Sequence, residues 1–254
     1  MCFFESPTGL RMQYECLEYR RRAGATIAIN CSMKTTVVVS PKRMKCLRKF
    51  LKNFPGGYHS EKFIAWERDY KWQAHLAWKE QLNIKAFEEL LDQHAYEKIA
   101  QAAVRIETRT NLLFSYEKMA LRDAVKTPVG AKSFAKGLYE YIYGQGPMPE
   151  RFTVFGEVLD SLPRVQTRVH TWPLHTVFGF IANPKAFIFM KPRVTQAAAE
   201  AYEFDFEYRS RPNWDTYQSL LDFAEIVRED TADLKPKDYI DLQSFIWVMG
   251  SEEY

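Results

Sequence analysis

The sequence lacks an apolar run long enough to form a membrane-spanning helix. Val177–Ala182 and Ala186–Met190 are typical of its longest apolar stretches. Both are far shorter than the ~20 residues that a helix needs to cross a bilayer. The chain has 254 residues, of which 46% are hydrophobic and 26% charged. Because this composition is ordinary for a globular chain, we expect a soluble protein with a large core and no membrane partner.

The common catalytic motifs are also missing. There is no Gly-x-x-x-x-Gly-Lys phosphate loop, no Gly-x-Gly-x-x-Gly turn, no Gly-x-Ser-x-Gly elbow and no His-Glu-x-x-His pair. These absences disfavour P-loop and Rossmann nucleotide binding, hydrolysis by an elbow serine and zincin chemistry. They leave open an enzyme whose site assembles from scattered residues.

Cysteine is confined to the first 49 residues, at Cys2, Cys16, Cys31 and Cys46, and no Cys-x-x-Cys pair occurs. A zinc knuckle or a thioredoxin-type site is therefore disfavoured. The absence of cysteine from the other 205 residues is untypical of a disulfide-built secreted protein, so we expect a reducing, cytoplasmic setting. Pro173 separates His170 from His175, and this spacing does not match a metal-ligand pattern. We predict no metal and no cofactor.

Charge divides the chain into two parts. Residues 1–49 hold ten Lys/Arg and three Asp/Glu, whereas residues 50–254 hold 25 and 29. We interpret 1–49 as a basic extension, which is either a β-hairpin (Thr26–Cys31 with Thr35–Val39) or unstructured sequence before a start at Met33 or Met44. Residues 50–254 are expected to form one helical domain, with a possible subdomain break at 144–149.

The periodicity of residues 50–254 is mostly helical. The fold class we predict is mainly α, a single domain of about eight helices with a minor β element. Ser60 and Thr127-Pro128 have the residue types of helix starts, and Gly144 that of a helix end. The expected helices cover residues 60–82, 85–93, 96–125, 128–143, 150–162, 173–181, 195–202, 215–234 and 238–249. Polar and aromatic residues alternate over Glu203–Arg209, which predicts a strand.

Three constellations of residues could carry function. The first is a basic stripe on the helix at 60–82, made of Arg68, Lys71, His75 and Lys79. At ~100° per residue these four side chains share one side, beside Trp72. Such a stripe suits a phosphate backbone, although a solvated helix face gives the same pattern.

The second constellation is Arg109 with Glu117, in the helix expected over Tyr96–Val125. Both lie on its apolar side, where an unpaired charge is costly. They could belong to an ion-pair network, line a polar pocket with a working carboxylate, or show that the helix is broken near Thr108–Asn111. As weak catalytic candidates, they support a second hypothesis, an enzyme of unknown reaction type.

The third constellation is spread over three predicted turns beside prolines. If these turns converge, their guanidinium groups form a phosphate site and their tryptophans offer stacking faces. The alternative is that the arginines pair with local acids. The predicted ligand-binding residues are Arg168, His170, Trp172, Lys191, Arg193, Arg209, Arg211 and Trp214.

Our leading hypothesis from the sequence is an intracellular helical module that binds a phosphate-bearing ligand through the third constellation. Nucleic acid is the favoured ligand class. The net negative charge of residues 50–254 requires any such contact to be local. A structural or regulatory module that binds a protein partner is the remaining alternative, because the many aromatic residues could line a partner groove.

Overall fold

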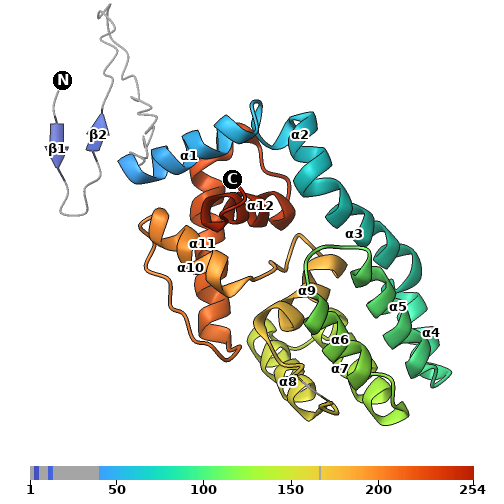
Figure 1. Ribbon diagram of the computed structural model, residues 1–254. Coiled ribbons are helices and arrows are strands. Elements are labelled where there is room, and N and C mark those ends of the chain that lie inside the picture. The colour runs from blue at the N-terminus through green and yellow to red at the C-terminus, as the bar shows by residue number, and fades with distance from the viewer. Residues whose placement is uncertain (1–2, 6–10, 14–39, 166) are drawn as a thin grey trace, which may run out of the picture.

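The computed structural model describes residues 3–5, 11–13, 40–165 and 167–254, and within them the chain is mainly helical (Figure 1). The α-helices are α1 (Pro41–Asn53), α2 (Glu61–Phe63), α3 (Asp69–Gln81), α4 (Ile84–Asp92), α5 (Tyr96–Thr108), α6 (Ser115–Ala124), α7 (Pro128–Tyr143), α8 (Met148–Ser161), α9 (Trp172–Ala182), α10 (Pro192–Ala201), α11 (Trp214–Asp230) and α12 (Tyr239–Gly250). Two short 3₁₀ turns, Gly57–His59 and Ala232–Leu234, and one π-helical turn, Ile64–Arg68, complete the helical elements. The segments predicted as continuous helices over 60–82 and 96–125 are each divided, and the expected number of about eight helices is not confirmed.

The minor β element is not confirmed where it was expected. Two three-residue strands, β1 (Phe3–Glu5) and β2 (Arg11–Gln13), pair antiparallel, with Phe4 opposite Met12. The hairpin predicted over residues 26–39 lies outside the described residues.

Residues 203–209 form no strand, although their side chains alternate as predicted between exposed acids and half-buried aromatics. Among the described residues, no strand pairs with the backbone of this segment. The N–H groups of Glu207 and Arg209 instead donate to Ser219 Oγ and Thr216 Oγ1 on α11, at 3.1 and 3.0 Å. The prediction was wrong because a period of two indicates only an extended chain with two different faces. This extended segment packs along helix α11 instead of joining a sheet.

Several helix ends agree with the sequence because side chains cap them. Ser60 Oγ accepts from the Phe63 N–H, and Thr127 Oγ1 accepts from the Gly130 N–H before α7. The continuous helix predicted over Tyr96–Val125 is wrong. It divides into α5 and α6, and the chain between them is held by Thr110, whose hydroxyl donates to the Glu107 carbonyl.

The helix predicted over residues 60–82 contains the π-helical turn Ile64–Arg68 between α2 and α3. A π turn is wider than an α turn, so the faces before and after it lose the register that a 3.6-residue period assumes. Phe63 and Arg68 are consequently both buried although they are five residues apart, and Trp66 is exposed. This shift determines which side chains of α3 reach the interior.

Helix α12 lies in the middle of the fold, where it packs against α1, α10, α11 and the π turn (Figure 1). Its apolar residues Ile240, Leu242 and Phe245 are buried, as its sequence predicted.

Helix α1 crosses the boundary predicted at 49/50 and contributes Cys46 and Phe50 to the core. Helices α7 and α8 pack against each other on either side of the 144–149 loop. No helix among the described residues could span a bilayer.

Candidate functional site: a pocket between helices α3 and α12

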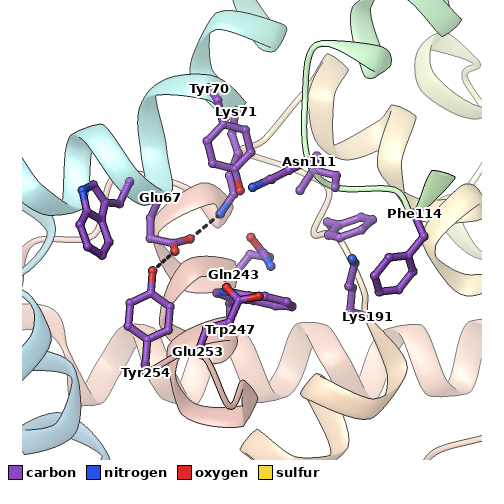
Figure 2. Close-up of a pocket in the computed structure, with 13 residues that line it drawn as sticks. Glu67, Tyr70, Lys71, Asn111, Phe114, Lys191, Gln243, Trp247, Glu253 and Tyr254 are labelled. Carbon is purple, nitrogen blue, oxygen red and sulfur yellow. Dashed lines mark hydrogen bonds and ion pairs between the residues drawn. The ribbon is translucent and has the colours of Figure 1, made fainter. Parts of the chain in front are cut away.

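A pocket of about 390 Å³ opens between the π turn, α3, α12 and the loop that joins α5 to α6 (Figure 2). We call it the α3–α12 pocket. Its walls combine aromatic rings with two lysines, two glutamates and two amides. The lining residues are Trp66, Glu67, Tyr70, Lys71, Asn111, Leu112, Phe114, Phe189, Lys191, Gln243, Trp247, Glu253 and Tyr254. The volume lies in the range of small-molecule sites.

A buried hydrogen-bonded network forms one wall of the pocket. Lys71 Nζ lies 3.2 Å from Glu67 Oε2, and the Tyr254 hydroxyl donates to the other oxygen of Glu67 (Figure 2). Lys71 Nζ also lies 2.7 Å from Ser244 Oγ. Next to it, Arg68 donates to Asp238 and Asp241 with N–O distances of 2.6 to 2.9 Å. These contacts fix α12 against the π turn, so the pocket wall is held on rigid elements.

Lys191 stands on the opposite wall, just before α10. Its Nζ lies 3.7 Å from the centre of the Phe114 ring and 5.6 Å from that of Trp247, in cation–π contact. It forms no ion pair within the described part of the chain. Desolvation by burial lowers the pKa of Lys191, while Glu117 and Glu253 act against that shift. An anion that entered the pocket would therefore find an ammonium group whose charge is not already matched.

The amide of Gln243 supplies an unused acceptor. Gln243 is buried on α12, and its Oε1 has no hydrogen-bond partner among the described residues. A buried polar atom without a partner costs free energy, so such atoms are rare unless a ligand or water completes them. The pocket thus offers an acceptor at Gln243, a cation at Lys191 and aromatic rings at Trp66, Phe114 and Trp247, of which Phe114 already contacts Lys191.

The predicted basic stripe does not form an open surface. Arg68 and Lys71 are buried in the network above, and His75 Nδ1 lies 2.9 Å from the Ile181 carbonyl oxygen. Lys79 alone of the four is exposed. The stripe faces inward because α12 presents Asp238, Asp241 and Ser244 to it, and the helical period of α3 alone gives no sign of these partners.

Arg109 and Glu117 do not share a buried face. Arg109 is the exposed C-cap of α5, whereas Glu117 is buried at the start of α6, where its Oε2 accepts from the Phe114 N–H at 2.8 Å. The break between α5 and α6 separates Arg109 from Glu117. This agrees with one of the three interpretations of the pair, a helix that is broken near Thr108–Asn111. The buried acid of α5 is Glu107, whose Oε1 lies 3.6 Å from Lys118 Nζ.

Most of the third constellation gathers around the start of α9. Trp172 is buried and its Nε1 donates to the Arg209 carbonyl, while Trp214 packs edge-on against Phe152. Arg168, Arg209 and Arg211 are exposed, and Arg211 pairs with Asp160 at 2.6 Å. The two tryptophans are occupied by packing, which leaves the guanidinium groups without a free ring to accompany them.

Lys191 and Arg193 lie apart from the other residues of the third constellation, because they contact α6 and α12. Lys191 lines the α3–α12 pocket, and the exposed Arg193 lies near Tyr116, whose pKa its charge lowers against a larger effect of desolvation. The three turns therefore do not form the single hollow that the sequence hypothesis assumed; Lys191 is the member that reaches a pocket.

The buried His170 and His175 form a chain that ends at the exposed Asp160. His170 Nδ1 lies 3.0 Å from Asp160 Oδ1, and its Nε2 lies 3.1 Å from His175 Nδ1. Gly156 makes room for both rings, since a Cβ there would lie 3.1 Å from His170 Cε1 and 3.3 Å from His175 Cε1. No group of side chains in the described ranges has the composition of a metal site.

Most of the pocket residues were not predicted from the sequence. Lys71 and Lys191 were singled out, but for surfaces that do not exist. A signal was available in α12, which carries Asp241, Gln243 and Ser244 in an otherwise apolar helix. A polar residue in a fully covered helix needs a partner or a cavity. Comparison with family models, curated proteins and solved structures found no match to this chain.

Proposed function

We propose that the protein binds a small, planar, phosphate-bearing ligand in the α3–α12 pocket. The observation that carries the proposal is the combination of unpaired Lys191 with the partnerless Oε1 of Gln243 between aromatic faces. Lysine binds phosphate as a point charge, and the exposed rings of Trp66 and Phe114 can cover a planar group. The acceptor at Gln243 favours a ring that carries an N–H or O–H donor.

The charge balance of the pocket supports an anionic ligand near Lys191 only. The carboxylate of Glu67 is already engaged by Lys71 and Tyr254, and Glu253 is exposed. A ligand would thus place its phosphate toward Lys191 and its ring toward Gln243. The expected cytoplasmic setting belongs to this proposal, and its support is the lack of cysteine in residues 50–254.

The proposal is tested by titrating the four nucleoside monophosphates into the protein, with tryptophan fluorescence and calorimetry as readouts. We expect a change in fluorescence because Trp66 and Trp247 line the pocket. Lys191→Met should weaken binding about tenfold or more, since loss of a charge-assisted contact costs about 1.5–3 kcal/mol. Lys185→Met is the matched control, because Lys185 is exposed outside the pocket. Equal affinity of the two variants, or no binding at millimolar ligand, would contradict the proposal.

Nucleic acid remains a second candidate ligand, at a different place. The observation that favours it is the exposure of Arg168, Arg209 and Arg211 around the start of α9. Binding there would depend on phosphate contacts, so it should weaken steeply with salt. Arg209→Ala combined with Arg211→Ala should abolish low-salt binding of single-stranded and double-stranded oligonucleotides, while Lys191→Met should not affect it. Unchanged binding by the double variant would exclude this surface.

A further inference from the structure

Lys71 differs from the other lysine of the pocket in its burial and its partners. Its side chain is only 2% exposed, yet it lines the pocket. Its Nζ lies 3.2 Å from Glu67 Oε2 (Figure 2). On its other side it lies 2.7 Å from Ser244 Oγ. The Ser244 hydroxyl in turn donates to the Ile240 carbonyl, so it accepts from Lys71 and cannot donate to it. The amine therefore has a fixed position at the pocket wall.

The surroundings of Lys71 ease the loss of its proton. Desolvation by burial lowers the pKa of Lys71, and the neighbouring Arg68 charge lowers it further, whereas Glu67 and Asp241 oppose both. A lysine held in a dry site beside another cation is a nucleophile toward carbonyl carbon. Glu67 is placed to accept the proton that the ammonium form must lose before attack. The Tyr254 hydrogen bond to that carboxylate keeps it oriented.

We propose that Lys71 forms an imine with an aldehyde group on a planar, phosphate-bearing ligand of the α3–α12 pocket. The inference rests on the proposed function and adds the reactive group of the ligand. The lone pair of Nζ adds to the carbonyl carbon, and the resulting carbinolamine loses its oxygen as water. The products are one C=N bond and one water molecule, with no oxidant or reductant. The aldehyde end of the ligand lies toward Lys71, and its phosphate lies toward Lys191.

The experiment uses pyridoxal 5′-phosphate as the probe, because it is a planar aromatic aldehyde with a phosphate. The full-length protein is mixed with a stoichiometric amount of the probe, reduced with borohydride, digested and mapped by mass spectrometry. We expect one pyridoxyl group per chain, on Lys71. An excess of pyridoxine 5′-phosphate, which has an alcohol in place of the aldehyde, should suppress the modification by occupying the pocket. Mapping in the wild-type chain needs no variant to fold.

Lys71→Arg keeps a cation in the network and removes the primary amine, so it should eliminate the mapped adduct. Lys191→Met should weaken pyridoxine 5′-phosphate binding and reduce adduct formation in proportion. Modification of Lys191 or of exposed lysines alone would overturn the inference, as would no modification at all. If pyridoxine 5′-phosphate binds but Lys71 is not modified, the imine fails and the proposed function stands. If neither compound binds, both fail.

Discussion

His175 is a fully buried imidazole whose second nitrogen faces no partner. Its Nε2 accepts and donates no hydrogen bond among the described residues, and its ring stacks on Phe152 with 3.9 Å between centres. If His170 donates from Nδ1 to Asp160, then His170 Nε2 is the acceptor and His175 Nδ1–H the donor between the rings. A proton added to His175 would place a charge in a buried site beside a second imidazole, and only a backbone contact with Phe152 favours that charge. Burial accordingly lowers the pKa of His175 well below its usual 6.5, and the pKa of His170 is lowered for the same reason.

Folding stability should therefore fall as the pH drops below about 6.5. In that range the histidines of the unfolded chain take up protons and those of the folded chain do not. The free energy of unfolding decreases by up to about 1.4 kcal/mol per pH unit for each such group. Urea unfolding from pH 7 to 5 measures this slope. The carboxyl groups with raised pKa values, Glu107, Glu117 and Asp241, act in the opposite direction.

A histidine variant separates the two effects, because those carboxyl groups are present in every protein compared. His175→Gln should flatten the pH dependence relative to the wild type. His59→Gln is the control. Because His59 is exposed, this substitution should leave the pH dependence of the free energy of unfolding as it is in the wild type. Identical slopes for all three proteins would show that the buried histidine pair does not govern acid sensitivity.

Between elements, the ion pairs of Arg68 join the π turn to α12. Its guanidinium group donates to both carboxylates of the α12 start, Asp238 and Asp241, and all three are buried. Arg68→Ala would leave two buried carboxylates without their cation. We expect a loss of about 3–5 kcal/mol in the free energy of unfolding, measured by chemical denaturation.

Arg109→Ala provides the comparison for that loss, because Arg109 is exposed at the end of α5. Its effect should stay within about 0.5 kcal/mol, as for surface substitutions in general. Similar losses for the two arginine variants would mean that the Arg68 contacts do not hold α12 in place.

Element by element, local signals in the sequence predicted the helices better than the site. Ser60 and Thr127 mark helix starts through side-chain caps, and Gly144 marks a helix end where a Cβ would meet the Glu140 carbonyl oxygen. Such effects act within a few residues. The inward direction of Lys71 depends on a π turn before it and on Ser244, 173 positions away. Neither has a signature in the periodicity of α3. The site is therefore determined by polar contacts between residues that are far apart in the sequence. These contacts can be identified only when the positions of α3 and α12 are known.

At the scale of the molecule, α12 ties distant parts of the chain together. It packs against α1, α10 and α11, and through the π turn it holds α3. Away from α12, helix α9 packs against α3, α5, α7 and α8, so contacts between the parts before and after the 144–149 loop continue through the rest of the fold. This arrangement favours one cooperative unit for the helical part of the chain over two subdomains divided at 144–149.

Thermal unfolding should then give a single transition. Tryptophan fluorescence and far-ultraviolet circular dichroism should have the same midpoint, and the calorimetric and van't Hoff enthalpies should agree. Two separated transitions, or a fluorescence midpoint that differs from the dichroism midpoint, would favour the two-subdomain alternative. Lengthening the 144–149 loop with glycine and serine offers a second measurement: a cooperative unit keeps one transition with a lowered midpoint.

The π turn at Ile64–Arg68 makes the pocket sensitive to the length of the chain as well as to its chemistry. The π turn fits five residues into about the rotation that four residues of an α-helix cover, roughly 400°, so α3 keeps its phase relative to α2 although the chain holds one residue more. Removing one residue there would leave Lys71 facing α12, but it would displace the side chains within the turn, Glu67 among them. A related chain shorter by that single residue could thus retain the helical scaffold and the place of Lys71 while it loses the carboxylate partner, with no substitution to reveal the loss.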